Sequence, residues 1–175
     1  MDIVRPRFNF YLLAVLCAGL VGSCATKKEK KLVTTLRVHA EASDNTTFKR
    51  KVKLFERDPF EMTVDQSTLL TEAEVETASI VDALGGFAFV INFNKRGQWL
   101  LDQHSSLNLG RHLAIFVQYG EKSAKARWLA APIISNRISD GALIFTPDCT
   151  REEAEQVAKG LGTKQGLGKP PKEDE

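Results

Sequence analysis

The sequence predicts an α+β domain in which an antiparallel sheet packs against about three helices. Three observations carry this prediction. Apolar and polar residues alternate with period two in several short stretches, two Thr-x-x-Glu sequences are typical of helix starts, and turn-forming residues separate these segments. With 175 residues, of which 43% are hydrophobic and 26% charged, the chain is long enough to bury the core of one domain. We expect this domain to occupy residues 35–162.

The first part of the domain is predicted to be β structure. The alternating stretches are residues 36–42, 51–54 and 60–65. Asp44-Asn45 is a turn signal, so the first two stretches are expected to pair as a hairpin, with His39 on the polar face of the first strand. Lys49-Arg50-Lys51 and Lys53 are expected to form a solvated face that protects a strand edge from further pairing. The alternative is that these basic residues form a docking surface.

Residues 71–83 are predicted to form the first helix. Thr71-Glu72-Ala73-Glu74 matches a capping box, in which hydroxyl and carboxylate satisfy each other's free backbone amides, and Gly85-Gly86 follows as a stop signal. The expected buried stripe consists of Ala73, Thr77, Ile80 and Leu84. Glu72, Glu74 and Glu76 suit the positive end of the helix dipole and are expected to be solvated rather than catalytic.

The second part alternates strands and helices. Residues 87–93 are apolar on both faces, which is typical of a central strand. Thr150-Arg151-Glu152-Glu153 is a second capping box that opens the last helix. The further predicted elements are a helix over 97–109 closed by Gly110, strands over 113–119, 125–131 and 142–145, a helix over 151–161, and a disordered tail over 163–175.

The N-terminus has the order of features of a secretory leader. Arg5 and Arg7 precede an apolar run from Phe8 to Val21. This run is shorter than a membrane-spanning helix, which needs about 20 residues. Val21-Gly22-Ser23-Cys24 then resembles the bacterial lipobox, in which cleavage between Ser23 and Cys24 leaves a diacylated cysteine as the first residue. The alternative is an ordinary signal peptide or an uncleaved anchor.

The lipobox resemblance implies the domain boundaries and the location. Residues 1–23 are predicted to be a lipoprotein signal peptide and residues 24–34 a lipidated Cys24 with a flexible tether rich in lysine. Acyl chains contribute about 0.8 kcal/mol for each buried methylene, so they hold a protein firmly at a membrane. We therefore expect a lipid-anchored protein of the cell envelope facing the periplasm, and Ala25 favours the outer over the inner membrane.

The sequence lacks the motifs of common catalytic, metal and cofactor sites. Cys149 is expected to be a buried apolar residue, and His39, His104 and His112 lie on different elements without ligand spacing, so neither metal nor cofactor is expected. The formal net charge of +2 gives no electrostatic reason to bind nucleic acid. A hydrolase or small-ligand site rests only on the proximity of Asp102, His104 and Ser105, and we predict no enzymatic activity.

Four segments between residues 69 and 162 resemble, in order and spacing, the head of the first periplasmic domain of SecD, an accessory subunit of bacterial protein export. They are Leu70-Thr71-Glu72-Ala73-Glu74-Val75, Phe89-Val90-Ile91-Asn92-Phe93-Asn94-Lys95-Arg96-Gly97, Asn108-Leu109-Gly110-Arg111-His112-Leu113-Ala114-Ile115, and Ile138 to Phe145 followed by Thr150-Arg151-Glu152-Glu153-Ala154. The family's six membrane spans have no counterpart in this sequence.

The resemblance implies a fold and a tendency to contact extended polypeptide, rather than a translocation motor. We expect an envelope lipoprotein that binds exported or envelope polypeptides through an apolar groove or an unpaired sheet edge. The alternative is a structural or assembly subunit of an envelope complex without a role in secretion, which would dock through the basic hairpin of residues 36–55.

Overall fold

The computed structural model describes residues 34–55, 59–120 and 123–163, which form two antiparallel sheets and two helices. The predicted signal peptide, Ser23, Cys24, most of the tether and the tail after Thr163 lie outside these residues. In chain order the elements are β1 (Thr35–Glu41), β2 (Lys49–Leu54), β3 (Phe60–Thr71), β4 (Val75–Ala83), β5 (Gly86–Phe93), α2 (Lys95–Leu107), β6 (Leu113–Tyr119), β7 (Lys125–Ala130), β8 (Ala142–Phe145) and α3 (Arg151–Thr163). None of the helices within the described ranges is long and apolar enough to cross a membrane.

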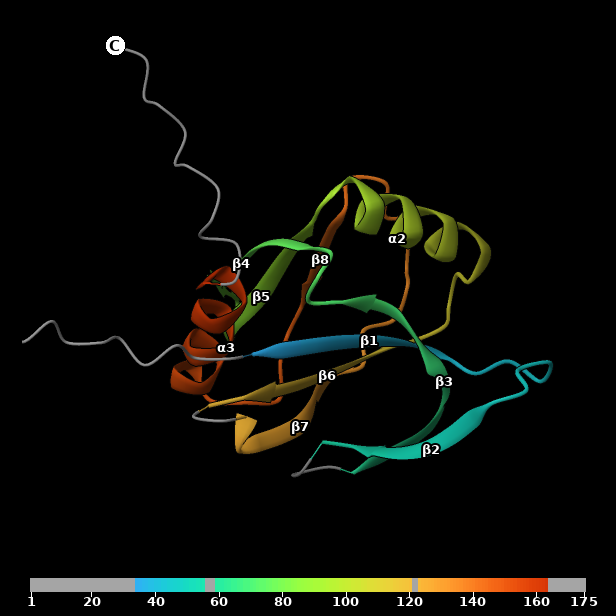
Figure 1. Cartoon of the computed structure of the whole chain (residues 1–175), viewed down its shortest axis with the longest axis horizontal. Helices are drawn as coiled ribbons and strands as arrows, with labels where there is room; N and C mark the ends of the chain where they lie inside the picture. Colours follow the sequence, from blue (N-terminus) through green and yellow to red (C-terminus); the bar gives the residue numbers. More distant parts are fainter. Residues whose placement is uncertain (1–33, 56–58, 121–122, 164–175) are drawn as a thin grey trace, which may run out of the picture.

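The larger sheet has the strand order β2-β3-β1-β6-β7 (Figure 1). The long strand β3 pairs with β2 along its first half and with β1 along its second. The predicted hairpin of the first two strands is therefore wrong, because β3 lies between them. The connection from Leu54 to Phe60 is shorter than the one from Glu41 to Lys49, so the loop that closes β2 onto β3 has the smaller entropy cost.

The smaller sheet has the order β4-β5-β8, and it replaces the helix predicted over residues 71–83. β4 pairs with β5 from Val75 opposite Phe93 to Ala83 opposite Gly86, through a two-residue loop in which Gly85 has φ of 85°. Leu84 and Gly85 thus form a hairpin turn rather than a helix end, since the positive φ of Gly85 suits glycine. The predicted central strand over 87–93 is confirmed as β5, between β4 and β8.

The first Thr-x-x-Glu sequence forms a turn between β3 and β4. The Glu74 carboxylate accepts hydrogen bonds from the Thr71 amide at 2.9 Å and from the Thr71 hydroxyl at 2.7 Å. Glu72 accepts a hydrogen bond from the Leu36 amide at 3.2 Å. The prediction of solvated carboxylates at a helix end is therefore wrong for Glu74, which is buried, while Glu76 is exposed.

The two other predicted helices are confirmed as α2 and α3, so the described residues contain two helices where about three were expected. α2 begins at the cap residue Asn94, whose side chain accepts a hydrogen bond from the Gly97 amide at 3.0 Å. α3 begins with the reciprocal bonds of a capping box. The Glu153 amide donates to the Thr150 hydroxyl at 3.3 Å, and the Thr150 amide donates to the Glu153 carboxylate at 3.4 Å.

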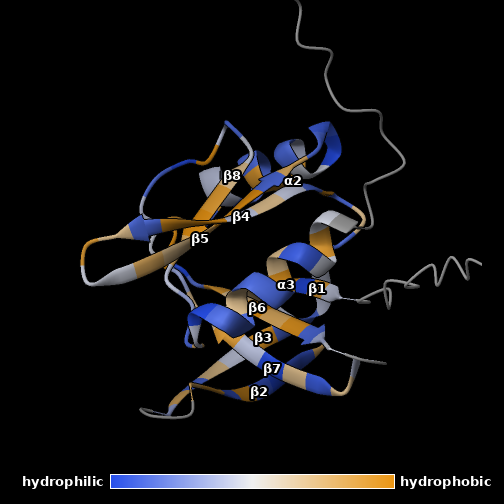
Figure 2. Cartoon of the chain, turned by 90° about the vertical axis from the view of Figure 1, so that its left-hand side faces the viewer, coloured by the Kyte–Doolittle hydropathy of each residue, from blue (hydrophilic) through white to orange (hydrophobic). Residues whose placement is uncertain are grey.

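One apolar core lies between the two sheets and is closed by α3 (Figures 1 and 2). Leu36 and Val38 of β1 and Phe89 and Ile91 of β5 are fully buried in it. α3 contacts both β4 and β6, and it contributes the buried residues Ala154, Val157 and Leu161. A second, smaller core of Val52, Leu54, Met62, Val64 and Ala114 lies on the opposite face of the larger sheet.

The close approach of α3 to β1 yields a stability prediction. A Cβ atom on Gly160 would lie 1.9 Å from the Thr34 hydroxyl oxygen, just before β1, so Gly160→Ala must move the helix or the strand. We expect a loss of about 1–3 kcal/mol of unfolding free energy, measured by denaturant titration. The matched control is Gly162→Ala, two residues further along α3, where a Cβ atom meets nothing within 4 Å. That variant should be neutral or up to about 1 kcal/mol more stable. Equal effects of the two substitutions would contradict the close approach.

Candidate functional site

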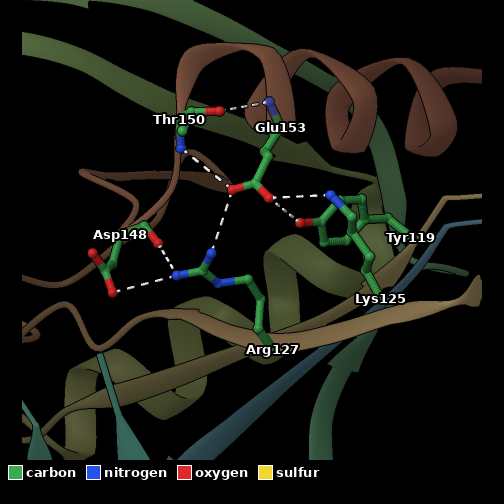
Figure 3. Close-up of polar contacts among 6 residues, drawn as sticks. All are labelled: Tyr119, Lys125, Arg127, Asp148, Thr150 and Glu153. Carbon is green, nitrogen blue, oxygen red and sulfur yellow. Dashed lines mark hydrogen bonds and ion pairs between the residues drawn. The ribbon is translucent and has the colours of Figure 1, made fainter. Parts of the chain in front are cut away.

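A cluster of titratable side chains gathers around Glu153, in the first turn of α3 (Figure 3). Its carboxylate accepts hydrogen bonds from the Tyr119 hydroxyl at 2.9 Å, Arg127 at 3.3 Å and Lys125 at 3.5 Å. Arg127 also donates to the backbone carbonyl of Asp148, in the segment that precedes α3. The cluster therefore ties α3 and the segment before it to the ends of β6 and β7.

The chemistry of this cluster favours a structural role. Burial, followed by the neighbouring Glu153 carboxylate, raises the pKa of Tyr119 to about 12. Burial likewise raises the pKa of Cys149 to about 11, so the thiol stays protonated at neutral pH and is a poor nucleophile. Cys149 packs partly buried against the main core, in agreement with the sequence-based interpretation.

The polar residues Asp102, His104 and Ser105 do not converge on a common site. Asp102 accepts a hydrogen bond from Arg137 at 2.7 Å, whereas the fully buried Ser105 hydroxyl accepts one from the Ile138 amide at 2.8 Å. His104 lies beside Asn108, whose side-chain amide donates to the His104 carbonyl at 2.9 Å. Because each group serves a separate local contact, the geometry does not support a hydrolytic site here.

The remaining histidines are held by other partners. His112 and the Glu41 carboxylate are 3.0 Å apart, at the start of β6. The prediction that His39 lies on a wet face is wrong, since only 6% of it is exposed. The larger sheet curls over its second core, so that His39 contacts the Trp128 ring from β7. No group of three or more histidine, cysteine or carboxylate side chains suited to a metal occurs among the residues described.

The free edge of β8 is a candidate binding surface. This strand pairs on one side with β5, in the register Leu143 opposite Ile91. The Phe93 amide donates to the Gly141 carbonyl at 2.9 Å, so by the antiparallel alternation Leu143 and Phe145 bond to β5. Ala142 and Ile144 then direct their backbone groups away from β5, and the Ala142 amide donates to Asp140 at 3.1 Å. The Ala142 carbonyl and both backbone groups of Ile144 are left available.

A groove of about 370 Å³ runs beside this edge. Its walls are β8 and the segment of residues 132–140 that precedes it, seen in orange in Figure 1. Two large apolar side chains line it while remaining open to solvent, with 56% of Ile133 and 60% of Ile144 exposed. We call Ala142, Ile144, Ile133 and the groove between them the β8 edge site. The sequence located the strand but not its free edge, which depends on the order of strands in the sheet.

The lysine-rich strand occupies a different edge. β2 is the outer strand of the larger sheet, and Lys49, Lys51 and Lys53 are exposed on it. This position agrees with the interpretation of these lysines as charges that discourage pairing at an edge. β8, by contrast, consists of Ala142-Leu143-Ile144-Phe145 and carries no charged residue.

Comparison with solved structures relates the fold to SecDF. A structure of SecDF, described as a membrane component that enhances protein export, aligns with a TM-score of 0.53 and 18% sequence identity, over 76% of this chain and 64% of that one. SecDF in a super-membrane-facing form aligns with a TM-score of 0.52 and 19% identity, over 74% of this chain and 19% of that one. The chain thus spans less than two thirds of the length of either.

The matched share of this chain exceeds the 94 residues of the segment 69–162 whose sequence resembles SecD. No family model and no curated protein sequence matches the chain. At 18–19% identity the comparison concerns the fold, and it confirms the SecD-like fold that the sequence predicts.

The Glu153 cluster generates a prediction with a defined pH dependence. Burial raises the pKa of Glu153, but the hydrogen bonds from Tyr119 and the Thr150 amide, together with Arg127, outweigh it and hold the pKa below the ordinary 4.5. A carboxylate with a lowered pKa stabilises the fold fully above 4.5, and the contribution is lost as the pH falls through the folded-state pKa.

We expect Glu153→Gln to lower the unfolding free energy at pH 7 by about 1–3 kcal/mol, because four donors (Tyr119, Lys125, Arg127 and the Thr150 amide) lose a charged acceptor. The difference from the unaltered protein should shrink as the pH falls below 4.5. Denaturant titrations at a series of pH values measure both effects. Glu155→Gln, an exposed neighbour on α3, is the control and should change little. A pH-independent difference would contradict the role of the carboxylate charge.

Proposed function

We propose that this protein is a non-catalytic, lipid-anchored protein of the cell envelope whose SecDF-like domain binds extended polypeptide at the β8 edge site. One observation carries the proposal. The backbone of Ile144 is unpaired on the outer side of β8, and the side chains of Ile144 and Ile133 next to it are exposed. An extended chain that adds to such an edge gains backbone hydrogen bonds, and its alternate side chains can occupy the groove.

A comparison of the four sheet edges in the described part of the chain supports this choice. β2 carries lysines, and β7 carries Lys125 and Arg127. β4 is in contact with α3. Charge and coverage are two ways in which proteins prevent unwanted strand pairing, and β8 has no charge of its own. A short edge with few free backbone groups suits transient binding, because each hydrogen bond contributes only about 1 kcal/mol.

The comparisons and the leader support the location and the kind of partner. SecDF is a membrane component that enhances protein export, and a domain of the same fold at the envelope would meet exported chains in an unfolded state. The sequence Val21-Gly22-Ser23-Cys24 supports an anchor on the envelope membrane. In this proposal the domain holds such chains briefly and carries out no reaction on them.

Binding at the β8 edge is tested by placing a charge on it. Ile144→Lys should weaken binding of reduced and carbamidomethylated ribonuclease A, a chain that cannot refold, by about tenfold, since an edge lysine opposes strand addition. The matched control is Val81→Lys on β4, the other outer strand of the same sheet, where 44% of the residue is exposed. The affinity is measured by fluorescence anisotropy, with native ribonuclease A as the folded comparison.

Three outcomes would overturn the assignment. Equal loss of affinity in Ile144→Lys and Val81→Lys would show that the β8 edge is not the binding site. Binding of native and unfolded ribonuclease A with equal affinity would show that extended polypeptide is not the ligand. If neither form binds and the protein extracted in mild detergent elutes as a stoichiometric complex, the domain is instead an assembly subunit.

The anchor is tested separately at Cys24. We expect Cys24→Ala to abolish acylation and to release the mature domain from the membrane, because the acyl chains supply most of the membrane affinity. Intact-mass spectrometry measures the acylation, and sedimentation of membranes after a high-salt wash measures the partitioning. Cys149→Ala is the control and should keep both properties. A Cys24→Ala protein that is processed and still sediments with washed membranes would contradict the anchor.

A further inference from the structure

A second pocket lies on the face of the larger sheet that points away from the main core. Its volume is about 600 Å³. Strand alternation places Arg37 and His39 on this face, because Leu36 and Val38 of the same strand are buried in the main core. The lining residues are Arg37, His39, Arg50, Lys51, Val52, Gln66, Phe116 and Trp128.

An aromatic group forms one wall of this pocket. The Trp128 ring lies 5.1 Å from the Phe116 ring and 5.7 Å from the His39 ring, between centroids. The Arg50 guanidinium lies 5.9 Å from the centroid of Trp128, which is a cation–π distance. Arg50 and Trp128 therefore bring the two outer strands of the larger sheet, β2 and β7, into contact at this pocket.

The pocket is positively charged. Arg37, Arg50 and Lys51 line it, and no aspartate or glutamate does. Neither Arg37 nor Arg50 forms an ion pair with any other residue of the ranges 34–55, 59–120 and 123–163. Both guanidinium groups are thus available to bind an anion through paired N–H donors.

The positive charge of the pocket also affects the pKa of His39. Its Nδ1 lies 2.9 Å from the Asp65 carbonyl, which can only accept, so Nδ1 carries the proton. Burial lowers the pKa of His39, whereas its hydrogen bonds to the backbone at Asp65 and Ser67 raise it. The positive charges of Arg50 and Arg37 lower the pKa further, and the net effect is a lowered pKa. An anion between the two arginines would offset part of their repulsion.

An exposed aromatic residue lies next to Gln66 of the pocket. Phe48 immediately precedes β2 and is 70% exposed. Its carbonyl accepts a hydrogen bond from the amide of Gln66, a lining residue of the pocket, at 3.0 Å. Lys49, Arg50 and Lys51 follow Phe48 directly in the sequence. An exposed aromatic side chain next to several basic ones is the combination that binds an anionic membrane surface.

We propose that this pocket binds the phosphate of an anionic phospholipid headgroup, with Arg37 and Arg50 on the phosphate and Phe48 in the interface. The proposal rests on the anchor at Cys24 for its membrane. Arg37 follows Cys24 by thirteen residues, which span at most about 45 Å, so the anchor keeps the pocket within reach of the headgroups. The basic face then sets the orientation of the domain, in addition to the attachment that the lipid provides.

The test follows Trp128 in the acylated protein that begins at Cys24, in a Trp99→Phe background that leaves a single tryptophan. The protein is reconstituted into vesicles of phosphatidylcholine alone or with three parts in ten of phosphatidylglycerol, and both carry lipids brominated near the headgroup. We expect quenching of Trp128 in the phosphatidylglycerol vesicles only. Arg37→Gln/Arg50→Gln should raise the amount of phosphatidylglycerol needed for half of the Trp128 quenching by about 20- to 30-fold. Each basic residue near an anionic surface strengthens binding about fivefold.

The matched control is Lys95→Gln/Arg96→Gln, which removes two positive charges from exposed positions of α2 and should leave the quenching unchanged. Thermal melts verify that both double variants fold. Equal quenching with both lipid mixtures, or in both double variants, would overturn the proposal. So would a Trp128 response to inorganic phosphate that is not accompanied by lipid quenching, which would assign the pocket to a soluble phosphate. Failure of the anchor is distinguishable, because the protein would then be missing from phosphatidylcholine vesicles altogether.

Discussion

The structure depends on the attachment of two sheets that share no hydrogen-bonded strand pair. β2-β3-β1-β6-β7 and β4-β5-β8 are joined by one apolar core, and α3 closes that core by contacting β4 and β6. The Glu153 carboxylate fixes the start of α3 to Tyr119 and Arg127 of the larger sheet. The position of the β8 edge relative to the basic pocket therefore follows from this helix and its core, since no ladder fixes it.

The two Thr-x-x-Glu sequences show how far a local motif determines structure. In both, the glutamate accepts a hydrogen bond from the threonine amide, at 2.9 Å for Glu74 and 3.4 Å for Glu153. After Glu153, residues Ala154, Val157 and Leu161 recur at helical spacing, and α3 follows. After Glu74, β-branched residues lead to Gly85-Gly86, and the strand that results can pair with the apolar residues 86–93. The motif fixes the turn, and the partner of the following segment decides between helix and strand.

Seven of the eight strands in the described part of the chain were predictable from alternation or continuous apolar sequence, and its two helices from caps and spacing. The β8 edge site was not, because a free edge is a property of strand order, and nothing within Ala142-Leu143-Ile144-Phe145 records which neighbours it has. The burial of His39 was missed for a related reason. Alternation assigns a residue to one of the two faces of a sheet, but it does not show whether that face is covered. The outer face of the larger sheet is covered at His39 because β2 curls toward β7 and a second core forms there. Cys24 remains a sequence-based prediction.

The two proposed surfaces lie on different sheets, and Figure 2 shows β8 toward one end of the domain and β2 and β7 toward the other. If the basic face contacts headgroups, β8 points away from the membrane, where an extended chain has free access to its backbone. A lipid on a short tether restricts distance but not orientation, so a tethered domain alone would present β8 to the membrane as often as to the periplasm. A weak second contact is enough to remove that ambiguity, because the anchor already supplies a high local concentration of headgroups. The basic residues of β2 and the uncharged edge of β8 then serve a single orientation, in which β2 faces the membrane and β8 faces away from it.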